Sequence, residues 1–326
     1  MIGMIKLKFV FVSIISLLVL TIVNIEAQTK NEAILAFNEG VSLMKTDVSK
    51  AILAFEKSLA ISEQVGDSAN DIKSKAIQEI PGLYYQKAKS FAMEKKWPET
   101  IAAGKDALKV SEKYNNIKIK DASQKLLVQS YVVVGGNYYK NKDDVNAIKA
   151  FDSAIYINPN YTKAYYNKAL VYNKMENTPE FLEQSNLVIE KAKAENDTNT
   201  VNQMTKSIGE YYAKIGIKNM KANQNSEAVN NFNSAFKYNY VTKDMYYYLA
   251  LVYNKQNKYD EALINANKGL EMETGTPEAK AKYYFELATA QAGKKDNDNA
   301  CANYKKANYG QFVTAVKAQL TNLKCK

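Results

Sequence analysis

The chain has 326 residues, of which 46% are apolar, and a formal net charge of +10. This length is enough for one large domain or two small ones. Every basic residue is a lysine, and the chain contains no histidine. Without histidine it lacks the usual general base and the commonest transition-metal ligand, which disfavours most hydrolases and metalloenzymes. We therefore expect no cofactor and no metal ion.

The excess of lysine indicates attraction to anions, which include nucleic acids, acidic proteins and anionic lipid or glycan surfaces. Arginine, which provides the two-pronged contact that phosphate and guanine recognition favour, is absent. A second explanation of the charge is compositional, because an AT-rich genome also produces chains rich in Lys, Asn, Ile and Tyr. Lysine-driven binding of anionic glycan or lipid surfaces is therefore kept as an alternative function.

The N-terminal segment has the composition of a secretory signal peptide. Lys6 and Lys8 precede an apolar run at 9–23, and the small residue Ala27 offers a cleavage point. As a helix this run would span about 22 Å, which is short of the roughly 30 Å hydrocarbon core of a membrane. We expect residues 1–27 to be removed and the protein to be exported to the periplasm or the outer membrane, with membrane association only through a partner. Export also makes nucleic acid an unexpected partner.

The middle of the chain contains a repeated pattern of small and aromatic residues, which is clearest in residues 128–161. Its members are Tyr131, Val134, Gly135, Tyr138, Ala147, Phe151, Ala154 and Pro159. They occupy positions 4, 7, 8, 11, 20, 24, 27 and 32 of a 34-residue unit. The pattern resembles the tetratricopeptide repeat, a helix-turn-helix family, with Tyr in place of Trp and Val in place of Leu.

The same frame recurs along nearly the whole chain after the signal peptide. The expected units are about 32–65, 81–114, 128–161, 162–195, 209–242, 243–276 and 281–314. The frame is weakest in the second helix of 162–195, where Phe181 and Ser185 replace the expected alanine and aromatic residue. The resemblance implies an all-α fold in which 28–326 form one right-handed solenoid of stacked antiparallel helix pairs. A helix at 311–325, which has no partner helix after it, is expected to cap the stack.

Extra residues separate some of the units. The segments at 121–127 and 200–208 each begin with a residue that can cap a helix, Asp121 and Thr200, three positions before a glutamine. We expect both segments to lengthen the helix that follows to about 20 residues. The segment at 70–80 is expected to lead into the unit at 81–114 in the same way.

The resemblance also implies which residues face a partner, because the first helix of each pair lines the concave side of such a stack. The candidate partner-binding residues are Tyr85, Lys89, Tyr139, Lys163, Tyr166, Asn173, Lys174, Tyr247, Asn254, Lys255 and Phe285. Two nearly identical segments, 165–174 and 246–255, contribute six of them. Tyrosine offers a large contact area, asparagine can bind a peptide backbone, and lysine can pair with a carboxylate. Most of the 24 tyrosines are nevertheless expected to pack in the core, and most lysines to face solvent.

These features favour a non-enzymatic, exported scaffold that binds a peptide or protein, as an adaptor or assembly factor of the bacterial cell envelope. An enzyme with an unrecognised lysine- or carboxylate-based site is a further alternative, and the oligomeric state is left open.

Cys301 and Cys325 are the two cysteines of the chain. In an exported protein they are candidates for a disulfide bond, provided that their Cα atoms lie within about 7 Å.

Overall fold

The structure is a computed structural model that describes residues 29–326. The predicted signal peptide, residues 1–27, lies outside the described residues. The chain divides into two compact units, which we call unit 1, ending at Val171, and unit 2, beginning at Tyr172. The prediction that 28–326 act as one domain stays a prediction.

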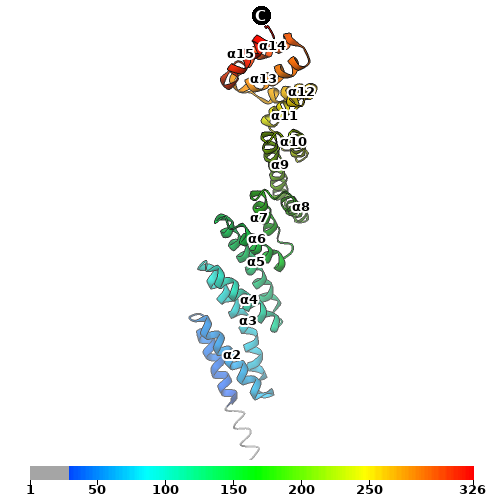
Figure 1. The fold of residues 1–326 in the computed structure, drawn as a ribbon. Helices are drawn as coiled ribbons and strands as arrows, with labels where there is room; N and C mark the ends of the chain where they lie inside the picture. The colour runs from blue at the N-terminus through cyan, green and yellow to red at the C-terminus, as the bar shows by residue number, and fades with distance from the viewer. Residues whose placement is uncertain (1–28) are drawn as a thin grey trace, which may run out of the picture. The chain divides into compact units, whose positions relative to one another are not determined.

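Every regular element of the described residues is helical (Figure 1). Unit 1 begins with a helix over residues 29–43 and continues with α2 (Val48–Val65), the short 3₁₀ helix η1 (Asp67–Ala69), α3 (Asn70–Met93), α4 (Trp97–Lys113), α5 (Ile117–Lys140), α6 (Asp144–Ile157) and most of α7 (Thr162–Lys174). Unit 2 continues with α8 (Thr178–Ala194), α9 (Thr198–Lys221), α10 (Asn225–Lys237), α11 (Lys243–Lys255), α12 (Tyr259–Met272), α13 (Pro277–Gly293), α14 (Asn297–Lys306), the 3₁₀ helix η2 (Gly310–Phe312) and α15 (Val313–Asn322). No helix within 29–326 is both long and apolar enough to cross a membrane.

Consecutive helices pack against each other as pairs within each unit. In unit 1, α3 packs on α4 and α5 on α6, and in unit 2 α9 packs on α10 and α11 on α12. The cores of these pairs are built from the small and aromatic residues of the repeat pattern, for example Ala147, Phe151 and Ala154 of α6. The predicted all-α fold of stacked antiparallel helix pairs is therefore confirmed within each unit.

The close approach of two paired helices depends on glycine in several places. A Cβ atom added to Gly135 would lie 2.5 Å from Cε1 of the buried Phe151, a distance that real Cβ atoms do not reach. The same relationship links Gly216 with Phe232 and Gly40 with Phe55, each at 2.8 Å. Glycine on the first helix thus makes room for the phenylalanine ring of the second helix.

Other pairs distribute the volume in the opposite way. Three pairs whose glycine position holds alanine have a smaller residue at the position of the ring in the repeat frame, namely Ala88 with Gly104, Ala169 with Ser185, and Ala250 with Ala266. The pair of α13 and α14 is an exception, because it combines Ala288 with the buried ring of Tyr304. Because protein interiors are close-packed, a larger residue on one helix favours a smaller one on the other.

Three first helices, α3, α5 and α9, have 24 residues each, which confirms that the inserts lengthen them. The predicted capping residues Asp121 and Thr200 lie too far along the chain, because α5 begins at Ile117 and α9 at Thr198. The side chain of Asn116 accepts a hydrogen bond from the backbone N–H of Ile119 at the start of α5. Asp197 accepts one from the N–H of Thr200 at the start of α9.

The helices are joined by short turns with a common conformation. The turn between α5 and α6, for example, consists of Asn141, Lys142 and Asp143, and Lys142 has a φ of 62°. A residue with positive φ lies at the middle of every three-residue turn of this kind, namely Lys95, Asn115, Lys142, Glu176, Asn196, Asn223, Asn257 and Lys295. Asparagine tolerates this left-handed conformation, whereas lysine and glutamate adopt it at a cost of roughly 1–2 kcal/mol.

The C-terminal helix α15 covers the end of unit 2, as the sequence predicts for a capping helix. Its Val316 is buried in a cluster with Ala288, Ala300 and Tyr304 of α13 and α14. Cys301 and Cys325 form a disulfide bond, with their Cα atoms 5.7 Å apart, so the predicted pairing is confirmed. The bond fastens the chain beyond α15 to α14.

Candidate functional site

The predicted partner-binding residues of unit 1 lie on three first helices. Tyr85 and Lys89 belong to α3, Tyr139 to α5, and Lys163 and Tyr166 to α7. The three tyrosines are half-buried, and the two lysines are exposed. Half-buried tyrosines beside exposed lysines leave ring edges and ammonium groups at the surface, where they can contact another molecule.

In unit 2 the second copy of the repeated segment forms α11. Its Lys255 is exposed, and Nζ donates a hydrogen bond of 3.3 Å to the Asn223 side chain. The corresponding residues of the first copy are Asn173, which is half-buried, and Lys174, which is exposed. The two copies therefore present their terminal lysine in the same way.

Tyr247, the predicted aromatic contact of α11, is held by its neighbours. Its ring packs edge-on against Tyr283 with the centroids 6.1 Å apart, and Nζ of Lys282 lies 5.4 Å from the ring centre. Burial raises the pKa of Tyr247 to about 12, and the nearby carboxylate of Glu286 acts in the same direction. The phenol is therefore neutral at physiological pH and available as a hydrogen-bonding group.

The structure corrects the prediction for Asn254. Its side chain is buried, with 8% exposed, and its Nδ2 donates to the backbone oxygen of Glu286 at 2.9 Å and to Oε2 of the same residue at 2.8 Å. Both amide hydrogens are thus used to join α11 to α13, and the amide does not face a partner. The Asn254 Oδ1 atom is buried without a hydrogen-bond partner.

Glu286 itself is a buried carboxyl group of α13, with 5% of the residue exposed. Burial raises its pKa to about 7, while the hydrogen bond from Asn254 and the charge of Lys255 partly oppose the shift. Among the described residues Glu286 has no ion-pair partner within 4.0 Å. Because its pKa is raised toward neutral pH, the Glu286 carboxyl group can gain or lose a proton near pH 7.

The prediction for Phe285 is also corrected. Its ring packs against Tyr304 of α14, with the centroids 5.5 Å apart, and against Phe312 of η2 at 5.2 Å. Helix α13, which carries Phe285, is the first helix of the last pair. The capping segment, which consists of η2 and α15, therefore packs against Phe285. Phe285 therefore belongs to the core cluster under α15 and not to a partner-binding face.

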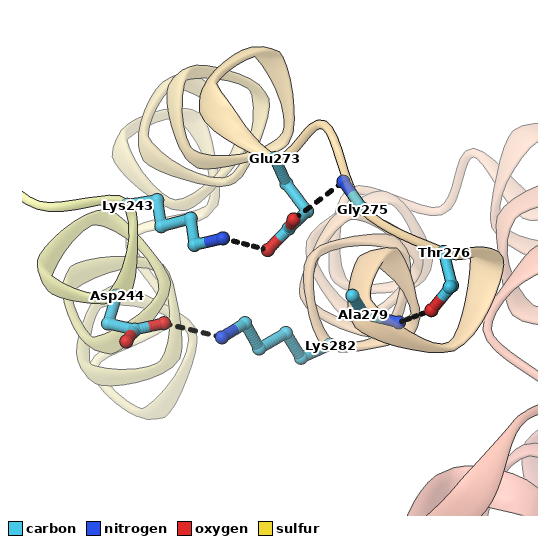
Figure 2. A network of polar contacts seen from close by, with 7 residues as sticks. All are labelled: Lys243, Asp244, Glu273, Gly275, Thr276, Ala279 and Lys282. Atoms are coloured by element: carbon cyan, nitrogen blue, oxygen red, sulfur yellow. Dashed lines mark hydrogen bonds and ion pairs between the residues drawn. The ribbon is translucent and has the colours of Figure 1, made fainter.

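A network of charged groups lies where α11, α12 and α13 meet, as Figure 2 shows. Lys243 pairs with the buried Glu273 at 2.8 Å, and Lys282 pairs with Asp244. The carboxylate of Glu273 also accepts the N–H of Gly275 at 2.9 Å. The hydrogen bond from Lys243 and then that from Gly275 lower the pKa of Glu273. Because the charges are paired within the chain, we assign this network to holding consecutive helix pairs together.

Two cavities lie beside α5 in unit 1, and neither is predicted from the sequence. One of 530 Å³ lies where α6 ends beside the N-terminal half of α5, and Gln124, Val128 and Ile157 are among its lining residues. The other has 380 Å³, and its lining residues include Val133 and the predicted Lys163. The sequence feature that could have indicated these cavities is the insert before residue 128. It makes α5 ten residues longer than α6, which has 14 residues.

Within residues 29–326, no cluster of three or more His, Cys, Asp or Glu residues could hold a metal ion.

No protein-family model matches the chain. No curated protein matches it. Several solved structures resemble it in fold. MamA protein is 22% identical with a TM-score of 0.33, over 61% of this chain and 97% of its own. YrrB, a TPR protein with an unusual peptide-binding site, is 18% identical with a TM-score of 0.35, over 59% of this chain and 91% of its own. A tetratricopeptide repeat protein from Parabacteroides merdae is 14% identical with a TM-score of 0.29, over 91% of this chain and 99% of its own.

These likenesses concern the fold alone. The helix pairs of this chain, with the small and aromatic signature residues buried between them, are themselves those of the tetratricopeptide-repeat fold.

Proposed function

We propose that the protein is a non-enzymatic scaffold that binds a peptide or protein partner through the first helices of its repeats. The observation that carries the proposal is the equivalent placement of Tyr166 and Tyr247. Both lie at position 5 of a first helix, both are half-buried, and each first helix ends in an exposed lysine, Lys174 or Lys255. Tyrosine is among the residues that contribute most to protein interfaces.

The chemistry of the buried polar groups supports binding over catalysis. Glu286 is engaged by the Asn254 amide of the same chain, and the chain contains no histidine that could act with it as a base. Glu273 and Asp244 are neutralised by lysines. The aromatic edges, amides and ammonium groups at the surface can recognise a ligand without reacting with it.

We further propose that the protein acts in the bacterial cell envelope, after export and removal of residues 1–27. The support is the lysine-flanked apolar run at the N-terminus. Cell fractionation combined with the intact mass of the protein tests this proposal. A mature chain that begins at Gln28 in the envelope fraction is the expected result, and an uncleaved chain in the cytoplasm would refute it.

The binding proposal is tested by capture of partners from an envelope extract of the native host. The double variant Tyr166→Ala/Tyr247→Ala is expected to lose the captured species. Tyr156→Ala is the matched control, because Tyr156 is 88% exposed but lies on the second helix α6. Equal capture by the native chain and the double variant would remove these faces from the proposal.

Salt dependence separates this proposal from the lysine-driven alternative. Binding to anionic glycan or lipid would weaken steeply as salt rises, because such binding is driven by the release of counterions. Capture through tyrosine faces should survive moderate salt. If heparin or anionic vesicles bind tightly at low salt and the tyrosine variants do not change this, the alternative is the better account.

A further inference from the structure

The disulfide bond of unit 2 borders a cavity at the protein surface. The cavity has a volume of 600 Å³, and both Cys301 and Cys325 are among its lining residues. Each cysteine is half-buried, while Asn297, Asp298 and Ala302, which also line the cavity, are exposed. A disulfide enclosed in a core is shielded from reductants, whereas an accessible one is open to thiol–disulfide exchange. A small dithiol can therefore reach this bond without unfolding of unit 2.

The charged side chains around the bond are mostly basic. Lys305, Lys324 and Lys326 line the same cavity, and Asp298 is the acidic residue of the lining. Lys305 follows Cys301 by one helical turn on α14, and its Nζ donates a hydrogen bond of 2.5 Å to the backbone oxygen of Lys326. Positive charges beside a sulfur atom stabilise the thiolate that leaves when a disulfide is broken. These lysines therefore favour reduction of the bond.

The helix that the bond retains is weakly anchored by its own packing. Helix α15 has ten residues, and Val316 is the one fully buried residue within 313–322. Leu320 and Leu323, which complete its apolar contacts, are half-buried. Isolated helices shorter than about 12–15 residues are marginally stable in water. We therefore expect α15 to leave its position and lose its helical structure once the bond is broken.

The capping segment covers apolar side chains of the last helix pair. Phe312 of η2 packs on Phe285 with the ring centroids 5.2 Å apart, and Val316 lies in a cluster with Ala288 and Tyr304. The repeat frame places Phe285 on the partner-binding side of its helix, where the capping segment now lies against it. Release of the capping segment would expose this ring.

We propose that the bond between Cys301 and Cys325 is a redox latch, which a dithiol reductant opens in the folded protein so that the capping segment leaves the rest of unit 2. One thiolate of the reductant attacks a sulfur atom, the S–S bond breaks, and the other cysteine leaves as a thiolate. The second thiol of the reductant then displaces the first cysteine from the mixed disulfide. Two electrons and two protons pass to the cysteines, which become thiols, and the reductant becomes a disulfide. The inference is independent of the proposed function, because neither Tyr166 nor Tyr247 takes part in it.

The first experiment measures how fast the bond is reduced in the folded protein. The purified chain is incubated with dithiothreitol at neutral pH without denaturant, and the free thiols are trapped by alkylation and counted by intact mass. The rate should rise in proportion to the dithiothreitol concentration and lie within about tenfold of that of an unstructured peptide with one disulfide. A rate that does not depend on the concentration, or is about 1,000-fold lower than that of the peptide, would overturn the inference, because the bond would then be reached only after unfolding.

A pair of lysine variants tests the role of the charges. Lys324→Gln should slow the reduction about threefold, because the Cys325 thiolate becomes a poorer leaving group without the neighbouring positive charge. Lys317→Gln is the matched control and should keep the native rate, because Lys317 is exposed on α15 and does not line the cavity. Equal rates for the two variants would contradict the role assigned to the cavity lysines.

The second experiment determines whether reduction releases the capping segment alone. Brief digestion with trypsin, followed by mass spectrometry, compares cleavage after Lys317 of α15 with cleavage after Lys268 of α12, both of which are exposed. Reduction should accelerate cleavage after Lys317 about tenfold or more and leave cleavage after Lys268 unchanged, because only the capping segment opens. The variant Cys301→Ser/Cys325→Ser should be cleaved after Lys317 as fast as the reduced chain, with or without dithiothreitol. Unchanged cleavage after Lys317, or equal acceleration at both lysines, would refute the latch.

Discussion

A Cβ atom on Gly135 would lie 2.5 Å from Cε1 of Phe151, so the contact between α5 and α6 requires the absence of a side chain at this position. The adjacent Gly136 has no heavy atom within 4 Å of such a Cβ. Gly135→Ala should therefore lower the free energy of unfolding by about 1–2 kcal/mol, since overpacking exceeds the gain in helix propensity. Gly136→Ala should raise it by about 1 kcal/mol. Urea denaturation followed by circular dichroism measures both, and equal effects of the two variants would refute the packing argument.

A second prediction concerns the left-handed residue of the turn between α5 and α6. Lys142 has a φ of 62°, which glycine adopts without steric cost. Lys142→Gly should raise the free energy of unfolding by about 0.5–1 kcal/mol. Asn115→Gly is the control, because the exposed Asn115 has a φ of 52° but asparagine already tolerates this conformation. Thermal denaturation should show a larger gain for the lysine variant, and a loss there would contradict the assigned strain.

The third prediction follows from the raised pKa of Glu286, which is about 7 in the folded chain against an ordinary value of 4.5 for a glutamate carboxyl group. Between these two pH values the folded chain keeps a proton that the unfolded chain releases, so stability falls as the pH rises. The stabilisation is fully present below pH 4.5 and lost above about pH 7, with a total of at most about 3 kcal/mol. A protonated Glu286 also has an O–H that can donate to the unpartnered Oδ1 of Asn254.

Glu286→Gln tests this prediction because glutamine keeps an acceptor for the Asn254 amide but cannot ionise. Urea denaturation between pH 5 and 8 should show a flatter pH dependence than in the native chain, and higher stability at pH 8. The exposed Glu271 of α12 gives the control variant Glu271→Gln, which should keep the native slope. The idea fails if Glu286→Gln and the native chain lose stability in parallel.

The fourth prediction concerns the disulfide between Cys301 and Cys325, which are 24 residues apart. Cys301→Ser/Cys325→Ser should lower the free energy of unfolding by about 3 kcal/mol, because a loop of this length is no longer closed in the unfolded chain. A reductant should destabilise the native chain and leave the double variant unchanged. Hydrogen exchange should accelerate in α15 and not in α11. Uniform acceleration across unit 2 would show that the bond does not act on the cap.

The sequence was sufficient for the helix pairs because their signal is local and periodic. Gly135, Ala147, Phe151 and Ala154 recur in register, and residues three, four or seven apart face the same side of a helix. The cap positions were less predictable. Asn116 and Asp197 each follow a positive-φ residue, and this turn conformation is not visible in a search for a capping residue three positions before glutamine.

The partner-binding residues were predictable only as far as the repeat frame determines them. Asn254 and Phe285 occupy face positions of the frame, but Glu286 and the capping segment engage them. These contacts join residues of different helix pairs, so no pattern within one repeat contains them. The 380 Å³ cavity beside α5 is not predicted for the same reason, because residues of α3, α4, α5 and α7 line it.

The exchange of volume between paired helices also limits how such a gene can be rearranged. A second helix with phenylalanine, such as α6, would clash if it were joined to α3, whose corresponding residue is Ala88. The reverse transfer, α4 with Gly104 placed after α5 with Gly135, would leave a void. Chimeras that exchange complete helix pairs should therefore be more stable than chimeras whose junction lies in the turn inside such a pair, so the pair is the natural building block for recombining this chain.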